Sequence, residues 1–147
     1  MSNSPKKDKR SVESAGFLLW KAANAWQRHV RDHLKSSGIT HVQFLLLDAM
    51  KQLEATGQQP SQTLLAKTAG TDVMMTSKVI RTLEAAKLVA RKDNRADGRA
   101  VVLQTTSSGK KKHATANSAI RRAEATFFAK LPDKPHKFVA NLQAISE

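Results

Sequence analysis

The sequence predicts a mainly α-helical fold with a small β-hairpin wing, a winged helix-turn-helix flanked by N- and C-terminal helices. Three observations predict it: apolar residues recur at helical spacing along most of the chain, two short helical segments meet at Gly70, and two strand-like segments then enclose a polar turn. The 147 residues suffice for one core and not for two. We therefore expect a single domain over residues 11–147, preceded by a disordered basic arm, residues 1–10.

Two helices are expected in the first third of the chain. The first covers residues 11–35 and is amphipathic, because apolar residues recur there at steps of three and four. These residues are Val12, Ala15, Leu19, Ala22, Trp26, Val30 and Leu34. Thr40 opens the second helix, and Thr56 with Gly57 closes it, since glycine suits the left-handed position after a helix.

A helix-turn-helix is expected next. Ser61 fits the N-cap of a short helix over residues 62–68, and Gly70 breaks the chain. Thr71 or Asp72 then caps a helix over residues 73–86. Its inward residues are Val79, Ile80 and Leu83. The outer side of this helix is polar, which is typical of a DNA-reading helix, although any small helical bundle has similar spacing.

A hairpin follows the helix-turn-helix directly. Residues 88–92 and 100–104 are expected to form strands, and residues 93–99 between them form a polar, turn-rich tip. A hairpin in this position is typical of a wing. Residues 107–130 then form a long helix, and residues 137–145 form a last short one after Pro132 and Pro135.

The charge of the chain favours a polyanionic partner. Its 25 Lys and Arg against 12 Asp and Glu give a formal net charge of +13, which favours nucleic acid first and an anionic membrane surface second. Residues 61–113 hold eleven basic and four acidic residues, so +7 falls within 53 residues around the helix-turn-helix and the hairpin. We expect this region to bind duplex DNA with a steep dependence on salt.

Several function classes are disfavoured. The chain has no Cys, which excludes disulfides and thiolate metal sites. It also has no apolar run near 18 residues, so we expect a soluble cytoplasmic protein without membrane contact. When bound to DNA, the protein is expected to associate with the nucleoid. We find no catalytic triad, P-loop, H-E-x-x-H or dinucleotide-binding pattern and expect neither an enzyme nor a cofactor. His29 and His33 have a spacing that can bind a metal, but a solvated or packing role is favoured over a metal site.

Three motifs indicate a family. A D-x-R motif stands at Asp97-Gly98-Arg99, a T-x-x-G motif stands at Thr106-Ser107-Ser108-Gly109, and the run from Ser77 to Glu84 precedes both. Together they resemble the MarR (multiple antibiotic resistance regulator) family of bacterial winged-helix transcription factors, over about residues 11–145. Two positions depart from the family pattern, with Lys87 where Gly is usual and Thr105 where Leu is usual. A left-handed conformation at Lys87 would cost about 1 kcal/mol.

The DNA-reading side chains are expected on the outer face of the helix over residues 73–86 and at the hairpin tip. The candidates on the helix are Met75, Thr76, Ser77, Lys78 and Arg81, with Met74 and Thr82 beside them. Lys78 or Arg81 suits guanine, and Thr76 or a methionine suits the methyl group of thymine. For Met74 and Met75 a place in the core is an open alternative, and Thr82 can instead bond back to its own helix.

The wing residues have separate expected roles. Arg95 at the tip suits a narrow minor groove, a role that the resemblance also implies. Asp97 is expected to hold the hairpin and orient an arginine, while Arg99 approaches the DNA backbone. A structural ion pair between Asp97 and Arg99 without DNA contact is the alternative.

The terminal helices have more apolar surface than a small winged helix covers. The resemblance implies that residues 11–35 and 107–147 intertwine two chains into a two-fold dimer, with residues 40–106 as the DNA-binding lobe. It also implies a pseudo-palindromic operator with half-sites about one helical turn apart. Many family members respond to small aromatic or phenolic anions held between the two parts. The residues that fit such a pocket are Phe17, Trp20, His41 and Phe44, with a core role open for Trp20 and Phe44.

These expectations combine into one function and one alternative. The function is a sequence-specific, homodimeric DNA-binding regulator, most simply a repressor, under the control of a small effector. The alternative is a basic protein that binds nucleic acid without sequence preference. The helix-turn-helix with its wing argues against the alternative, because a protein that binds by charge alone needs no reading helix.

Overall fold

The computed structural model describes residues 14–93 and 101–147. The elements in chain order are α1 (Ala15–Leu34), α2 (His41–Ala55), α3 (Gln62–Ala69), α4 (Val73–Ala85), β1 (Val89–Asp93), β2 (Val101–Thr105), α5 (Ser107–Phe127), the 3-10 helix η2 (Phe128–Lys130) and α6 (Pro135–Ser146). The predicted mainly helical fold with one hairpin is therefore confirmed. The predicted basic arm and residues 94–99 of the predicted hairpin tip lie outside the described residues, whereas Asp93, also predicted in the tip, is the last residue of β1.

Side-chain caps fix the starts of the helices. Thr40 caps α2 through a capping box, in which its hydroxyl accepts from the N–H of Gln43 and the Gln43 side chain accepts from the N–H of Thr40. Ser61 caps α3, as predicted. Asp72 and not Thr71 caps α4, because Oδ1 of Asp72 accepts from the N–H of Met75 at 2.7 Å.

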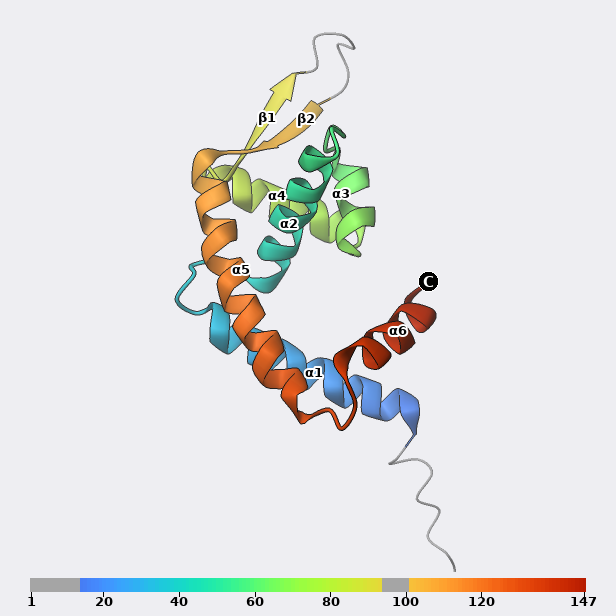
Figure 1. Cartoon of the computed structure of the whole chain (residues 1–147). Helices are drawn as coiled ribbons and strands as arrows, with labels where there is room; N and C mark the ends of the chain where they lie inside the picture. The colour runs from blue at the N-terminus through green and yellow to red at the C-terminus, as the bar shows by residue number, and fades with distance from the viewer. Residues whose placement is uncertain (1–13, 94–100) are drawn as a thin grey trace, which may run out of the picture.

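The winged lobe consists of α2, α3, α4 and the hairpin (Figure 1). The strands are antiparallel, with Val89 opposite Thr105, and each lies one residue later than predicted, at 89–93 and 101–105. The N–H of Leu103 also donates to the carbonyl oxygen of Pro60, which ties β2 to the segment before α3. The largest fully buried apolar side chains all belong to this lobe or to the adjoining end of α1: Val30, Leu46, Leu47, Met50, Leu65, Ile80 and Leu83.

The T-x-x-G motif joins the wing to α5. The hydroxyl of Thr106 donates to the carbonyl oxygen of Lys87 at 2.7 Å and accepts from the N–H of Gly109 at 3.0 Å. A Cβ atom at Gly109 would lie 2.1 Å from the carbonyl oxygen of Leu88, so only glycine allows this approach. Lys87 has φ of +58°, so this residue does adopt the left-handed conformation whose cost was considered from the sequence.

A single long helix connects the two ends of the molecule. In Figure 1, α5 runs from the wing to α1 and α6. Its first half packs on α2 and its second half on α1, where Nε2 of His29 lies 2.8 Å from Oγ1 of Thr126. The predicted helix over 107–130 ends as an α-helix at Phe127 and continues as η2. The last helix begins at Pro135 and not at Lys137, because proline is well suited to the first helical turn.

The outer parts of α1 and α6 cover no core in the single chain. Only Val30 and Leu34 of α1 are buried, so the predicted apolar face of this helix is covered at its C-terminal end alone. No residue of α6 is buried, and Figure 1 shows this helix extending away from the lower end of α5. Among the helices of the described ranges, none has both the length and the apolar character needed to cross a bilayer.

Candidate nucleic-acid interface and ligand cavity

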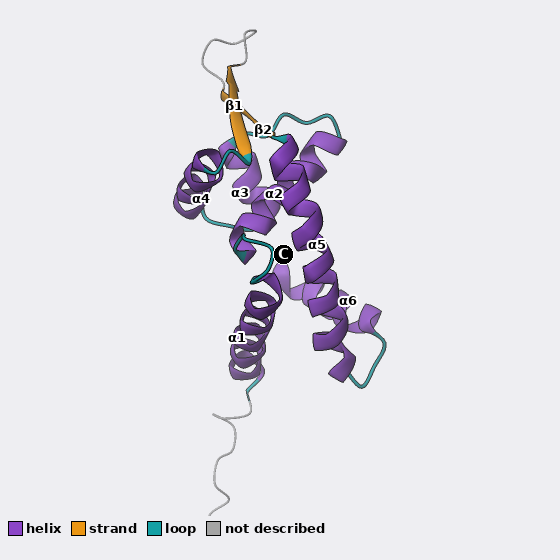
Figure 2. Cartoon of the chain, turned by 90° about the vertical axis from the view of Figure 1, so that its left-hand side faces the viewer, coloured by secondary structure: helices purple, strands orange, loops and turns teal. Residues whose placement is uncertain are grey.

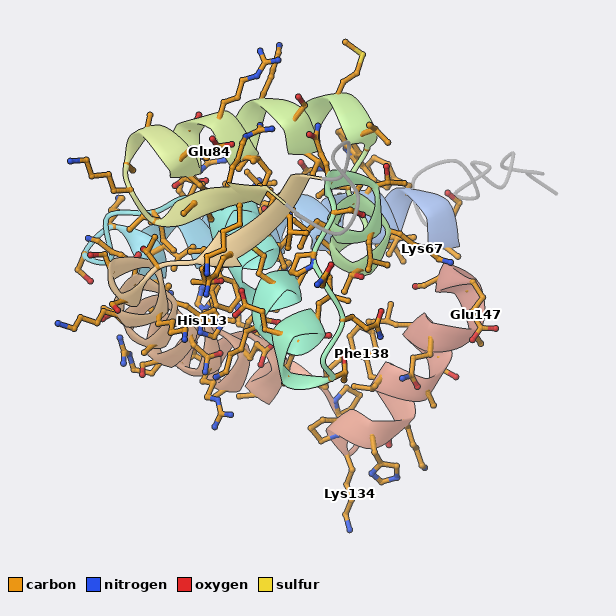
Figure 3. The ribbon with its side chains drawn as sticks, turned by 90° about the horizontal axis from the view of Figure 1, so that it is seen from above. Lys67, Glu84, His113, Lys134, Phe138 and Glu147 are labelled. Atoms are coloured by element: carbon orange, nitrogen blue, oxygen red, sulfur yellow. The ribbon has the colours of Figure 1, made fainter. Side chains whose placement is uncertain are left out.

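The exposed face of α4 is the candidate DNA-reading surface. Figure 3 shows α4 at one edge of the molecule, with side chains projecting outward along its length. Met74 and Met75 are 78% and 44% exposed, which excludes the alternative that they belong to the core. Lys78 and Arg81 are exposed and Ser77 is half-buried on the same helix. The structure thus brings four of the five predicted helix residues to one accessible surface.

The fifth residue, Thr76, was wrongly expected to read DNA. Its side chain is 0% exposed and faces the core, one helical turn before Ile80. The Thr76 hydroxyl donates to the carbonyl oxygen of Asp72 at 2.7 Å and lies 2.7 Å from the hydroxyl of Thr71. Thr76 therefore anchors the start of α4 and cannot reach a base.

Some polar side chains on or near α4 are bonded within the protein, and others remain available to a partner. The hydroxyl of Thr82 donates to the carbonyl oxygen of Lys78 at 3.2 Å, the back-bonding considered from the sequence. Nε of Arg91 on β1 donates to Oε1 of Glu84 at 2.7 Å, so this arginine ties the wing to the end of α4 (Figure 3 labels Glu84). Within residues 14–93 and 101–147, neither Lys78 nor Arg81 forms an ion pair, which leaves both cations available to a partner.

The three predicted wing residues cannot be placed on this surface. Arg95, Asp97 and Arg99 lie outside the described residues. The described strands on either side end at Asp93 and begin again at Val101, so the wing projects from the same lobe as α4 (Figures 1 and 2).

A cavity of about 400 Å³ lies between α1, α2 and α5. The residues that line it are Trp26, His41, Phe44, Leu45, Asp48, Asn117, Ile120, Arg121 and Glu124. Two of the four predicted effector residues, His41 and Phe44, are therefore brought together. Phe17 and Trp20 are not among the lining residues, because they lie on the uncovered first turns of α1, well before Trp26.

Aromatic rings form one wall of this cavity. The ring of Trp26 lies 6.4 Å from that of His41, edge to face, and 5.3 Å from that of Phe127. Burial lowers the pKa of His41 below its ordinary value, and its Nδ1 lies 3.1 Å from Oε1 of Gln27. Phe44 is almost fully buried and stacks on His113, so only its accessible edge can serve a ligand.

Two buried polar contacts escaped the sequence analysis. Nε2 of His113 on α5 donates to Oδ1 of Asp48 on α2 at 2.8 Å, and His113 is buried. Oε1 of Glu54 accepts from both the N–H and the hydroxyl of Thr105, at 3.0 and 3.1 Å. The helical period gave one usable signal, because His113 precedes Ala116 at a step of three and so lies on the buried face. Nothing in the local sequence indicates its partner, which is 65 residues away.

The cavity also contains residues that the sequence analysis did not select. Arg121 contributes a cation and Asn117 an amide, both from α5, while Asp48 and Glu124 contribute carboxylates. Asn117, Arg121 and Glu124 are three, four and seven residues apart along α5, and this helical spacing was a possible signal. This spacing indicates a binding site only once the structure shows that α1 and α2 form the other walls of the cavity.

The histidine pair of α1 has a packing role. Nε2 of His29 lies 3.1 Å from the carbonyl oxygen of Ala123, and Nδ1 of His33 lies 2.9 Å from the carbonyl oxygen of His29. Both rings are half-buried and lie 4.4 Å apart. In the described part of the chain, no three His, Cys, Asp or Glu side chains come together in a group that could hold a metal ion.

The chain is similar to known transcriptional regulators. A model of the MarR family matches residues 39–101. An uncharacterized HTH-type transcriptional regulator, YdcH of Bacillus subtilis (strain 168), is 39% identical over 132 residues, which cover 90% of this chain and 89% of the relative.

Solved structures agree with this similarity. BpsR of Bordetella bronchiseptica, whose DNA binding is regulated by 6-hydroxynicotinic acid, is 26% identical with a TM-score of 0.80, over 92% of this chain and 100% of BpsR. A mutant MarR of E. coli complexed with operator DNA also has a TM-score of 0.80, over 93% of this chain and 96% of that one. At 17% identity, the second match supports the fold alone.

Proposed function

The chain belongs to the MarR family of transcriptional regulators, and from this premise we propose that it is a homodimeric repressor that reads a pseudo-palindromic operator. The observation that carries the proposal is that α4 packs one face on the core and exposes the opposite face. Asp72 caps this helix, and Thr76, Ile80 and Leu83 seat it on the core. The opposite face presents accessible cations and thioethers at a position where duplex DNA can approach.

Lys78 and Arg81 are the proposed base-reading cations. They are three residues apart and therefore lie on the same side of α4, and both are exposed. Cationic side chains donate to O6 and N7 of guanine in the major groove. Met75 and Ser77 add an apolar contact for a thymine methyl group and a short hydroxyl donor. We propose that Arg95 enters the adjacent minor groove from the wing tip, that Asp97 holds the hairpin and orients an arginine, and that Arg99 approaches the DNA backbone.

A second copy of this chain is the proposed cover for the apolar surfaces of α1 and α6. Leu18, Leu19 and Trp20 are each at least half exposed on α1. A cavity of about 800 Å³ between α5 and α6 has mostly apolar walls, formed by Ala125, Phe128, Ala129, Leu131, Pro135, Phe138, Val139 and Leu142. Soluble monomers rarely leave such surfaces uncovered. A two-fold dimer built through them would present two copies of α4 to one operator.

The proposed effector is a small aromatic acid bound in the cavity between α1, α2 and α5. Its volume of about 400 Å³ suits a molecule with one ring. Trp26 offers a ring face, Arg121 offers a positive charge for a carboxylate, and Asp48 and Glu124 offer acceptors for a hydroxyl or ring N–H group. Because α2 belongs to the winged lobe and α1 to the outer part, a ligand between them can change the position of α4.

Selection from a library of random duplexes tests the proposed function. We expect the purified protein to enrich one sequence with two inverted half-sites whose centres are about 10 base pairs apart. Sedimentation velocity of the free protein should give the mass of two chains. Enrichment of no sequence would overturn the operator proposal and favour a basic protein that binds DNA by charge alone. A monomer at micromolar concentration would overturn the dimer.

A further inference from the structure

The first turn of α4 carries two exposed thioethers. Met74 and Met75 are adjacent, and Val73 before them is also exposed. The chain has four methionines and no cysteine. The third described methionine, Met50, is 0% exposed in the core of the winged lobe. Within residues 14–93 and 101–147, the only sulfur atoms accessible to a reagent in solution are therefore those on the proposed DNA-reading helix.

The local structure explains why both thioethers face outward. The N–H of Met75 is bonded to the Asp72 carboxylate, which fixes the first turn of α4. Thr76 occupies the inward position of that turn and is fully buried. Since successive helical residues are turned by about 100°, Met74 and Met75 have no core position to occupy. Neither thioether belongs to the buried core, so a chemical change at either sulfur atom would not disturb the core packing.

We propose that Met74 and Met75 form an oxidation-sensitive site, at which conversion of the thioethers to sulfoxides releases the protein from DNA. The inference rests on the proposed function, in which α4 reads the operator. The reactant is a peroxide, a two-electron oxidant that donates one oxygen atom. The sulfur lone pair attacks one peroxide oxygen, a sulfur–oxygen bond forms and the oxygen–oxygen bond breaks. With hydrogen peroxide, the sulfur is oxidised by two electrons and the peroxide is reduced to one molecule of water.

The consequence for DNA binding follows from the polarity of the product. A thioether is flexible and apolar and can lie against a thymine methyl group without losing hydrogen bonds to water. A sulfoxide carries a strong oxygen acceptor, and burying that acceptor against a methyl group removes its water without replacement. The acceptor would also approach the electron-rich edges of the bases. Both effects weaken the complex, whereas the free protein retains its fold.

The absence of thiols makes the thioethers the principal sites for this chemistry. Cysteine thiolates, where present, react with peroxides before methionine does, but this chain has none. Met50 serves as an internal reference, because oxidation of a fully buried thioether requires the lobe to open. Bound operator should in turn slow the oxidation of Met75 by covering it.

The test measures operator affinity before and after treatment with hydrogen peroxide, using the duplex enriched from the random library. Mass spectrometry of proteolytic fragments follows the sulfoxide content of each methionine. For the wild-type protein we expect affinity to fall at least fivefold once Met74 and Met75 are oxidised, with Met50 unmodified and the thermal unfolding midpoint unchanged. Methionine sulfoxide reductase should restore the affinity.

Matched variants separate this site from other oxidation damage. Met74→Leu with Met75→Leu keeps the apolar volume without an oxidisable atom and should bind operator before and after peroxide with equal affinity. Each single Leu variant provides the same comparison at one sulfur atom. Met74→Gln with Met75→Gln imitates the polar product and should bind weakly without any oxidant.

Two outcomes would overturn the inference. The first is wild-type protein that carries both sulfoxides and still binds operator with unchanged affinity; the proposed function would then stand while the oxidation site fails. The second is an equal loss of affinity in the wild-type protein and the double Leu variant. Failure of the proposed function would be seen separately, as untreated protein that prefers no sequence, and would remove the basis of the inference as well.

Discussion

The carboxylate of Glu54 accepts two hydrogen bonds from Thr105, one from its N–H at 3.0 Å and one from its hydroxyl at 3.1 Å. This contact joins the last turn of α2 to the end of β2 and so holds the base of the wing against the winged lobe. It also explains how the chain accommodates a hydroxyl at a position where family members usually carry Leu. The Thr105 side chain is buried, and Glu54 supplies the acceptor that it needs.

Removal of the Glu54 acceptor should destabilise the fold more than removal of the hydroxyl. Glu54→Ala leaves two buried donors of Thr105 without a partner and should lower the free energy of unfolding by about 2 kcal/mol. Thr105→Val removes one donor and preserves the backbone hydrogen bond, so it should cost less than about 1 kcal/mol. Urea unfolding at a fixed protein concentration measures both. Equal losses in the two variants would show that the backbone bond to Glu54 contributes nothing.

Lys87 stores backbone strain that glycine would relieve. Its φ of +58° is unfavourable for a residue with a Cβ atom. Lys87→Gly should therefore raise the free energy of unfolding by about 1 kcal/mol, even though glycine usually destabilises folded chains. Lys87→Ala removes the same charge but retains the Cβ atom, and it should leave stability close to that of the wild-type protein. A gain for Ala equal to that for Gly would assign the effect to charge and not to backbone conformation.

Gly109 should tolerate no larger side chain. Gly109→Ala places a Cβ atom 2.1 Å from the carbonyl oxygen of Leu88, and both are backbone-linked groups that cannot rotate away. We expect a loss of at least about 2 kcal/mol in unfolding free energy, with α5 displaced from the wing. Gly16→Ala on α1, where no atom lies within 4 Å of the added Cβ, is the matched control and should be neutral or slightly stabilising. Normal stability of Gly109→Ala would contradict the close approach.

His41 should make stability depend on pH below neutrality. Burial lowers its pKa from the ordinary value of 6.5, so the unfolded chain binds a proton more readily than the folded one. The contribution of His41 is fully present above pH 6.5 and is lost as the pH falls through its folded-state pKa. His41→Gln should flatten the fall in unfolding free energy between pH 7.5 and 5.5. His136→Gln on exposed α6 should retain the wild-type slope; an unchanged slope in His41→Gln would remove His41 as the cause.

Local signals in the sequence predicted the helices and their caps, because capping residues and apolar periodicity act within a few positions of the chain. Ser61 and Thr40 illustrate this, since their partners lie three residues away. The burial of Thr76 could have been predicted from the helical spacing, because Thr76 is four residues before Ile80 and so lies on the same, buried face of α4. It was missed because a threonine on a DNA-reading helix suggested a contact with DNA.

Contacts between distant segments could not be predicted in this way. The bond between Asp48 and His113 depends on how α2 and α5 cross, which no local pattern specifies. The cavity was predicted only in part for the same reason, since Arg121 and His41 line one cavity only after α5 has packed against α2. In the first turns of α1, by contrast, the local pattern was predictable but its packing partner was not. Their apolar period was correctly identified, but the single chain provides no surface to cover Leu19 and Trp20.

The preference of the protein for its operator over random duplex tests the central claim most directly. The ratio of the two dissociation constants, measured at one salt concentration, should fall at least tenfold in Lys78→Ala with Arg81→Ala, because each base contact discriminates by about 1–3 kcal/mol. Lys134→Ala with Lys137→Ala removes the same charge from exposed positions at the start of α6 and should leave the ratio unchanged. If the α4 variant instead lost affinity for operator and random duplex by the same factor, Lys78 and Arg81 would contact phosphates only, and α4 would not be the helix that reads the sequence.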